Sequence, residues 1–409
     1  MVKILHTADI HLDSPLKTLA LRNADLATRI HSATRQAFSR IIDTAITEDV
    51  AALLIAGDLF DGAQRSARTA AFLTRELDRL RHANIRVFYI KGNHDAENPI
   101  TGEMDLPENV HVFDGRGGKV QLNDQVWIHG VSFAGKHAPD SLLPKFPAPV
   151  AGAVNIAMLH TSLAGAAGHD TYAPCSVAEL RNMGFDYWAL GHVHKRQVHA
   201  MDPPIIMPGM PQGRDMGETG PKSATMLDIT EAGITLSELP TSAVEFLRVS
   251  LDVSDMPTTD ALRDGLRACL AGYAEDIASD AAVLRLTLTG NSPLHWQILR
   301  DHAVWSETVQ HMAEDTGLLW LDRLDIALVS DLANSQGAVA ELEALMHTIR
   351  AEPGFAQSCD ALMEAVLKDL PAGRRATLLP NPDAQTELRQ RLAATGAEAI
   401  LARMKGADG

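Results

Sequence analysis

The sequence predicts an α/β protein with a smaller second domain and a helical tail. Three observations lead to this fold class. Over residues 1–240, apolar strand-like runs alternate with helix-like segments. Over residues 241–330 the pattern becomes a short β-α-β-α-β series, and residues 331–409 contain only helix-like segments. A chain of 409 residues is also too long for one ordinary core, so two or three domains are expected.

The first region is expected to hold the largest sheet. Buried strands are predicted at Lys3–Thr7, Ala51–Ala56, Arg86–Ile90, Val126–Val131, Val154–Leu159 and Tyr187–Leu190. Helices are predicted at Thr34–Glu48, Ser66–His82 and Cys175–Met183, the last opening with a capping-box pattern. Gly and Pro turns separate the last three strands, which predicts an antiparallel end to the domain: Ile205–Met207, Ala224–Ile229 and Ile234–Leu239. These elements indicate one or two sheets covered by helices.

The pattern changes near Thr241. Strands are predicted at Phe246–Val253, Val283–Thr289 and Leu318–Val329, with helices at Asp260–Tyr273 and His295–Met312 between them. Three helices follow, at Gly337–Arg350, Phe355–Leu370 and Asp383–Met404, and prolines separate them. We therefore expect a compact small domain followed by a helical tail.

Composition excludes several classes of protein. The chain has 36 basic and 52 acidic residues, a net charge of −16, which argues against attachment to nucleic acid through a global basic field. Local phosphate binding stays open, because metal ions can supply positive charge. Three cysteines without a CxxC pair favour neither a disulfide framework nor a thiolate zinc site. The first residues lack a signal sequence and the longest apolar runs are too short to cross a bilayer, so a cytoplasmic protein is expected.

Five segments rich in metal-ligand residue types each follow directly on a strand-like run. They are Asp9-Ile10-His11, Gly57-Asp58, Gly92-Asn93-His94-Asp95, His160 and Gly191-His192-Val193-His194. Because α/β proteins place their sites at the carboxyl ends of strands, we expect these segments to meet at one edge of a sheet. Such a cluster of carboxylates, one amide and several imidazoles is too polar for a core. It suits two divalent metal ions.

The residue types also indicate which chemistry the cluster supports. Mixed nitrogen and oxygen ligands without thiolate suit manganese, iron or zinc better than calcium. One Asp carboxylate has two oxygens and can bridge two metals. Two ions about 3.5–4 Å apart can share a hydroxide, lower its pKa and clamp a phosphate during in-line attack. Taken singly, each Asp or His has an ordinary reading as a cap, turn or surface residue; the repeated position at strand ends favours a site.

The order of these motifs resembles the calcineurin-like metallophosphoesterases over residues 1–240. The resemblance implies a four-layer α/β/β/α domain and two divalent metals, with Mn²⁺ expected. It assigns Asp9, His11 and His194 to the first metal, Asn93, His160 and His192 to the second, and Asp58 as the bridge. It makes His94 the residue that stabilises the transition state or protonates the leaving oxygen. Asp95 would orient the His94 imidazole.

A narrower resemblance is to DNA-repair exonucleases of the SbcD and YhaO type. It rests on Thr7–Asp13, Gly57–Asp61 and Gly191–His194, and on a second signature, Pro208–Arg214 followed by Glu218–Lys222. The small domain resembles the capping domain that selects how DNA enters. The resemblance implies 3′-to-5′ exonuclease activity with endonuclease activity on single strands, a homodimer, and a coiled-coil ATPase partner of the SbcC or YhaN type. The helical tail would dock this partner.

Several alternatives stay open at this point. Arg214 could hold a phosphate or form a domain-fixing ion pair with Glu218 or another acid. His169 could line the cleft or form a loop-stabilising pair with Asp170, and Asp61 could support His94 or cap a helix. The metal motifs also permit a smaller phosphodiester or phosphomonoester substrate, and a non-catalytic scaffold subunit is a further alternative.

Overall fold

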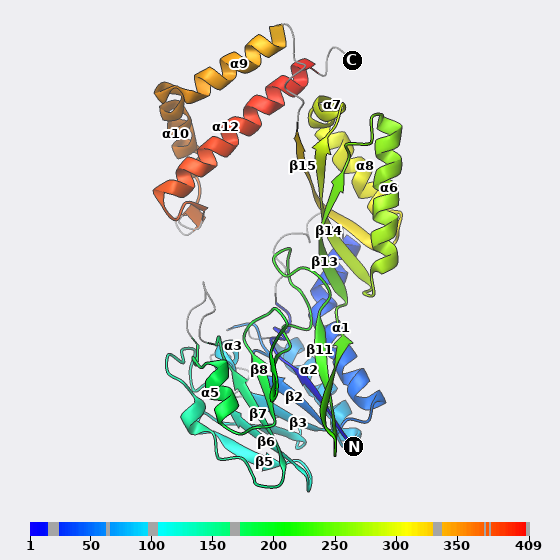
Figure 1. The fold of residues 1–409 in the computed structure, drawn as a ribbon, viewed down its shortest axis with the longest axis vertical. Coiled ribbons are helices and arrows are strands. Elements are labelled where there is room, and N and C mark those ends of the chain that lie inside the picture. Colours follow the sequence, from blue (N-terminus) through cyan, green and yellow to red (C-terminus); the bar gives the residue numbers. More distant parts are fainter. Residues whose placement is uncertain are drawn as a thin grey trace. The chain divides into compact units, whose positions relative to one another are not determined.

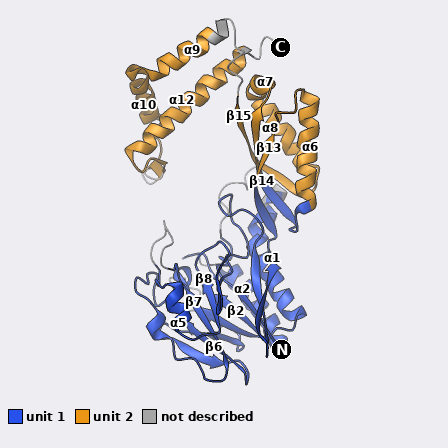
Figure 2. Ribbon diagram, viewed as in Figure 1, with its two compact units in different colours: residues 1–248, 276–284 blue, residues 249–275, 285–409 orange. Residues whose placement is uncertain are grey.

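The computed structural model describes residues 1–14, 24–62, 66–96, 105–163, 172–329, 338–371, 374–375 and 378–405. The chain divides into two compact units (Figure 2). The first contains residues 1–248 and 276–284, and the second contains residues 249–275 and 285–409.

Two six-stranded sheets form the first unit (Figure 1). The first sheet has the order β12 (Gly233–Pro240), β11 (Ser223–Thr230), β1 (Val2–Thr7), β2 (Ala52–Ala56), β3 (Arg86–Ile90), β4 (Val110–Val112). The second has the order β5 (Gly118–Gln121), β6 (Val126–Val131), β7 (Val154–His160), β8 (Tyr187–Gly191), β10 (Pro204–Met207), β9 (Gln197–Met201). The central pairs are parallel, whereas β11, β12, β5 and β9 pair antiparallel.

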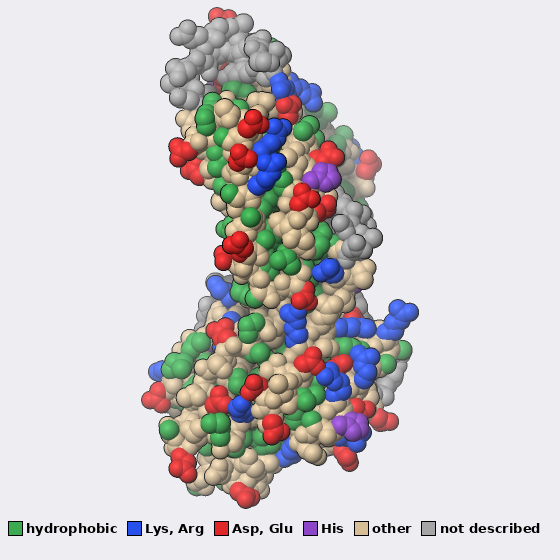
Figure 3. All heavy atoms as spheres, turned by 90° about the vertical axis from the view of Figure 1, so that its right-hand side faces the viewer, with side chains coloured by type: hydrophobic (Ala, Val, Ile, Leu, Met, Phe, Trp, Pro, Cys, Tyr) green, Lys and Arg blue, Asp and Glu red, His purple; other side chains and the backbone are tan. Residues whose placement is uncertain are grey.

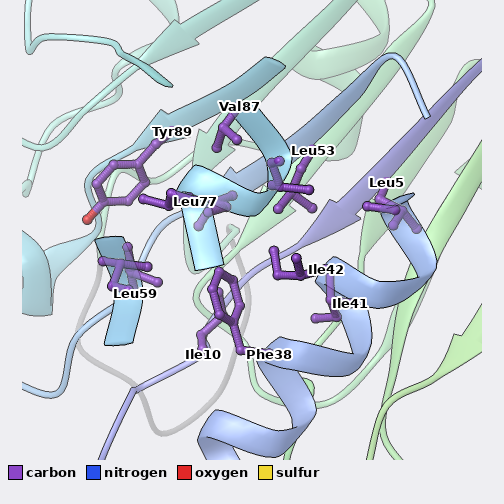
Figure 4. Close-up of a cluster of buried hydrophobic side chains, with 14 of the residues drawn as sticks. Leu5, Ile10, Phe38, Ile41, Ile42, Leu53, Leu59, Leu77, Val87 and Tyr89 are labelled. Carbon is purple, nitrogen blue, oxygen red and sulfur yellow. The ribbon is translucent and has the colours of Figure 1, made fainter. Parts of the chain in front are cut away.

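The sheets face each other across one apolar core, and each is covered on its outer face. Ile4, Leu54 and Phe88 of the first sheet pack with Ile156 and Tyr187 of the second. Helices α1 (Ala24–Thr47) and α2 (Ala67–His82) cover the first sheet (Figure 4). Helix α5 (Val177–Asn182) and nearby loops cover the second. Burying each Leu, Ile or Phe side chain stabilises the folded state by about 1.5–3 kcal/mol relative to leaving it exposed to water. The predicted α/β/β/α fold class is confirmed.

Local sequence signals account for several element boundaries. Ser66 is the N-cap of α2, and its side chain accepts a hydrogen bond from Thr69 N at 3.3 Å. The capping box expected at the start of α5 is present between Ser176 and Glu179. The sequence did not predict the edge strands β4, β5 and β9, because they lack apolar runs. Their residues are partly buried or exposed, except for the buried Ala200 of β9.

A three-stranded sheet of order β13 (Val244–Asp252), β14 (Ala281–Asn291), β15 (Leu319–Val329) follows. Its helices are α6 (Thr259–Asp276), α7 (His295–Arg300) and α8 (His302–Glu314). The prediction of one helix over His295–Met312 was wrong, because the helix breaks at Asp301, where ψ is 26°. The Asp301 carboxylate pairs with the preceding Arg300 at 2.7 Å, and Asp has low helix propensity.

The remaining described elements are helices α9 (Ala338–Ala351), α10 (Pro353–Leu367) and α12 (Pro382–Lys405). α9 and α10 both pack against α12. Within the described residues, every helix is too short or too polar to cross a membrane. The face of the molecule in Figure 3 carries acidic and basic side chains interspersed rather than gathered by sign.

A buried histidine joins the two sheets and makes stability depend on pH. The Tyr187 hydroxyl donates to His6 Nδ1 at 2.9 Å, and His6 Nε2 donates to Leu190 O at 3.0 Å. Only a neutral imidazole can accept at Nδ1 while it donates from Nε2. Burial lowers the pKa of His6 to about 3, whereas an unfolded chain protonates His near pH 6.5. Between these values the unfolded state binds more protons, so the free energy of unfolding falls as the pH falls.

We therefore expect His6→Gln to reduce this pH dependence, because Gln does not titrate. Urea unfolding between roughly pH 7 and 5 measures it. The exposed His82→Gln on α2 is the matched control. Equal pH slopes for wild type and His6→Gln would contradict the assignment.

Candidate metal centre

The ligand residues lie where strands of the two facing sheets end. Asp9 and His11 follow β1, Asp58 follows β2, and Asn93 opens the short helix α3 (Asn93–Ala96) after β3. From the second sheet, His160 is the last residue of β7, and His192 and His194 follow β8. The expectation of a single sheet edge was wrong: β2 contacts β7 and β8, and the cluster is shared by two sheets.

The first group of ligand atoms comes from Asp9, His11 and His194, which lie within 4.8 Å of one another. The Nε2 atoms of His11 and His194 are 3.2 Å apart. Both Asp9 oxygens accept from His192 N, at 3.1 and 3.0 Å. The fold therefore brings together the three residues that the family resemblance assigns to the first metal.

The second group comes from Asp58, His160 and His192, again within 4.8 Å. Asn93 Oδ1 lies 3.1 Å from His160 Nε2 and 3.2 Å from His192 Nδ1. Asp58 Oδ2 is 3.4 Å from His160 Nε2 and 3.9 Å from His11 Nε2. Asp58 thus lies between the two groups, as a bridging carboxylate must.

Four of these seven residues have positive φ angles although none is glycine. The values are 51° for Asp9, 45° for His11, 51° for Asp58 and 110° for His192. Such conformations cost of order 1–3 kcal/mol each and persist only where the surroundings enforce them. Here Asp9 N donates to Gly57 O and His11 N to Asp58 O, both at 3.0 Å. The two ligand loops hold each other in place.

The glycines that precede the ligands are required by space. A Cβ atom at Gly92 would overlap Asp58 Oδ1 and the His160 ring, and one at Gly191 would overlap Ala56 O. The motifs Gly-Asn-His-Asp and Gly-His-x-His therefore contain glycine because the ligands approach the backbone closely.

Electrostatics favours a cation in this cluster. Burial alone would raise the pKa of the Asp58 carboxyl, but the imidazoles of His160 and His11 outweigh it and lower that pKa below its usual range. Burial opposes a charge on His160, yet Asp58 raises the pKa of this imidazole to about 9. A buried carboxylate is costly unless a positive charge lies next to it. Nitrogen and oxygen donors that converge on it fit divalent metal ions.

His94 lies beside these groups. Its ring centroid is 4.9 Å from that of His11, and one of its nitrogens lies within 4.8 Å of ligand atoms of His11 and Asp58. The His94 side chain is 39% exposed, whereas those of His11 and His160 are at most 1% exposed. Burial lowers the pKa of the His94 imidazole, and the negative charge of Asp58 only partly offsets this effect.

The Asp95 carboxylate accepts hydrogen bonds from two backbone N–H groups. Its oxygens accept hydrogen bonds from Phe60 N and Gly92 N, both at 3.0 Å. Among the described residues, the carboxylate within ion-pair distance of the His94 ring is that of Asp61, at 3.8 Å. Asp95 fixes the loops after β2 and β3. Its burial, with the nearby Asp58, raises the pKa of its carboxyl to about 6.

Arg214 forms the ion pair considered from the sequence. Its Nη2 donates to Glu218 Oε1 at 3.0 Å. Glu218 Oε1 is also 2.7 Å from Nδ1 of His194, a contact that sequence reasoning missed. In the sequence, only the presence of Glu218 in the second signature pointed to a role for this residue. His169, the other expected substrate-binding residue, lies outside the described residues.

A four-layer α/β/β/α domain that gathers imidazoles, carboxylates and an amide at its strand ends defines a metallophosphoesterase. The chain belongs to the calcineurin-like phosphoesterases. That family's model matches residues 2–196, and the model of the middle domain of metallophosphoesterase YhaO matches residues 246–329. Proteins of this family bind divalent metals, and the cluster supplies candidate sites for them.

Two relatives cover most of the chain. The metallophosphoesterase YhaO of Bacillus subtilis is 31% identical over 336 residues, 78% of this chain and 80% of that protein. The DNA double-strand break repair protein Mre11 of Sulfolobus acidocaldarius is 25% identical over 323 residues, 73% and 78% respectively. A dimetal phosphatase from Danio rerio is 12% identical over 59% of this chain and 98% of its own, with a TM-score of 0.38.

Gly92→Ala tests the close packing of the centre. The added methyl group displaces Asp58 or His160, so we expect the variant to retain fewer metal ions per chain and to lose phosphoester hydrolysis. Metal content by mass spectrometry of the purified protein measures this.

Gly272→Ala, on the exposed surface of α6 with open space around it, is the matched control. It should be neutral or stabilising by about 0.5–1 kcal/mol. A Gly92→Ala variant with full metal content would show that the packing is not required.

Proposed function

We propose that this metallophosphoesterase is a DNA nuclease with 3′-to-5′ exonuclease activity and endonuclease activity on single strands. The observation that carries the proposal is the complete set of ligand residues, gathered at the strand ends of a chain related to Mre11 break-repair proteins. The middle region that follows it, which matches the YhaO middle domain, supports a substrate larger than a small phosphoester.

The residues divide into two roles in the proposed reaction. Asp9, His11 and His194 would hold one metal ion and Asn93, His160 and His192 the other, with Asp58 between them. When bound, the two ions supply activation of a water nucleophile and neutralisation of charge on the phosphate. Mn²⁺ is the proposed metal, since the donors are nitrogen and oxygen without thiolate.

His94 is assigned to the substrate, because its imidazole is the more exposed one beside the buried ligands. Burial keeps this imidazole neutral near pH 7, so it donates an N–H to a phosphate or leaving oxygen. Removing one such donor costs about 2.7–4 kcal/mol of transition-state stabilisation. The Asp61 carboxylate lies nearby, 3.8 Å from Nδ1 of His94.

A nuclease assay on end-labelled single- and double-stranded DNA tests the proposal. With Mn²⁺ present, both substrates should be degraded. His94→Gln should lower kcat by roughly 10²–10³-fold while binding metal, and Asp58→Asn should lose metal and activity together. His31→Gln, an exposed histidine on α1, is the matched control.

Two outcomes would favour the alternatives. Hydrolysis of bis-p-nitrophenyl phosphate without any cleavage of DNA would indicate a smaller phosphoester substrate. Purified protein without metal, with ligand variants that behave as wild type in a repair assay, would indicate a scaffold subunit.

We further propose residues 1–240 as the nuclease domain, 241–330 as the capping domain and 331–409 as the docking region for a coiled-coil ATPase. Support for docking comes from apolar side chains left exposed on the tail. Leu362 and Val366 lie one turn apart on α10 and are each 70% exposed, and such stripes commonly bind partner helices. A homodimer stays a prediction from the family.

Charge introduced on this stripe tests the docking proposal. Leu362→Asp with Val366→Asp should weaken association with the co-expressed coiled-coil ATPase at least tenfold, about 1.4 kcal/mol, in a titration of purified subunits. Gln357→Asp, exposed on the same helix, is the matched control. Equal affinity of the double variant and the wild type would rule out α10 as the docking site.

A further inference from the structure

The second signature, residues 208–222, is fixed at one end to strand β13. Gln212 is 1% exposed. Its Nε2 donates to Val244 O at 2.6 Å, and its Oε1 accepts from Ala243 N at 2.8 Å. Thr241 Oγ1 donates to Pro211 O at 2.7 Å. The segment is therefore anchored by a buried amide to the backbone that leads into the middle region.

The other end of the segment contacts the first ligand group. Glu218 Oε1 lies 2.7 Å from His194 Nδ1, and Oε2 accepts from Arg214 N at 2.8 Å. Arg214 Nη2 also donates to Glu218 Oε1, at 3.0 Å. Arg214 Nη2 lies 3.2 Å from His194 Nδ1, farther than Glu218 Oε1. Because the shorter contact is to a carboxylate, which only accepts hydrogen bonds, we assign the proton of His194 to Nδ1, and Nε2 faces His11.

An acid also lies near His11, but at a longer distance. Asp61 Oδ1 lies 3.5 Å from His11 Nδ1, and Arg214 Nη1 is 3.9 Å from the same oxygen. The Arg214 guanidinium thus lies between Glu218 and Asp61. Glu218 is hydrogen-bonded to its histidine, whereas His11 Nδ1 has no hydrogen-bond partner among the described residues. The second group differs, because His160 Nδ1 donates to the backbone oxygen of Ala56 at 2.9 Å.

We propose that Glu218 is a positioning residue for the first metal site, and that its carboxylate fixes the ring orientation and tautomer of His194. A carboxylate behind a ligand imidazole also raises its basicity, and removing such a partner costs about 10–100-fold in metal affinity. Glu218 therefore controls one of the two metal sites and leaves the other, which relies on a backbone carbonyl, unaffected. This inference rests on the proposed metal centre and not on the identity of the substrate.

Metal titration of the purified full-length chain tests the proposal without any nucleic acid. Wild-type apoprotein should bind two Mn²⁺ ions by calorimetry and by electron paramagnetic resonance. Glu218→Gln preserves size but removes the charge. We expect it to bind one ion with the wild-type Kd and the second about 10–100-fold more weakly. Glu218→Asp should partly restore the second site.

Glu76→Gln is the matched control, because Glu76 is a buried acid of α2 that pairs with Arg79 at 2.6 Å. It should bind both ions as the wild type does. Unchanged affinity of both ions in folded Glu218→Gln would overturn the proposal, as would an equal loss at both sites.

Wild-type chain that binds fewer than two ions would overturn the metal centre itself and the positioning role with it. By contrast, a wild-type chain that binds two ions but does not cleave DNA would contradict the nuclease proposal and would leave the role of Glu218 unaffected. The two failures are therefore distinguishable.

Discussion

The buried carboxylate of Asp58 is the constraint on which the site depends. It is 2% exposed and lies between two sheets, where an unpaired charge would cost several kcal/mol. His160, His11 and the backbone N–H of His94, at 2.9 Å, surround it. Each of these partners lies at the end of a different strand, so placing one carboxylate requires the ends of β1, β2, β3 and β7 to meet. The packing of the two sheets supplies the stability that this arrangement needs.

The same requirement explains the backbone. Ligand loops that converge on one small volume leave no room for a Cβ at Gly92 or Gly191, and they force left-handed φ angles on Asp9, His11 and Asp58. The apolar core between the sheets offsets this local strain. The core and the site therefore depend on each other. Apolar packing between the sheets stabilises the fold, and this stability offsets the cost of the strained, polar loops at the strand ends.

The sequence was sufficient for the strands and the ligand set, because each buried strand is an apolar run and each ligand follows directly on one. It was insufficient where geometry depends on tertiary contacts. Asp95 is next to His94 in the chain, yet its carboxylate accepts from Gly92 N and Phe60 N. Glu218 is 24 residues from His194, and no periodic pattern connects them. The break at Asp301 lacks a Gly or Pro signal, and the edge strands lack apolar runs. The sharing of the cluster by two sheets follows from packing, which a single sequence does not encode in any local pattern.

Charge links metal binding to substrate binding. With a net charge of −16 and mixed signs on the face in Figure 3, the chain offers little long-range attraction to a polyanion. Arg214, the basic side chain beside the first ligand group, is already paired with Glu218. In the proposed reaction, bound metal ions would then supply positive charge for a phosphate. Occupancy of the first site, which would depend on His194 and the acid behind it, would therefore govern phosphate binding as well as the chemical step.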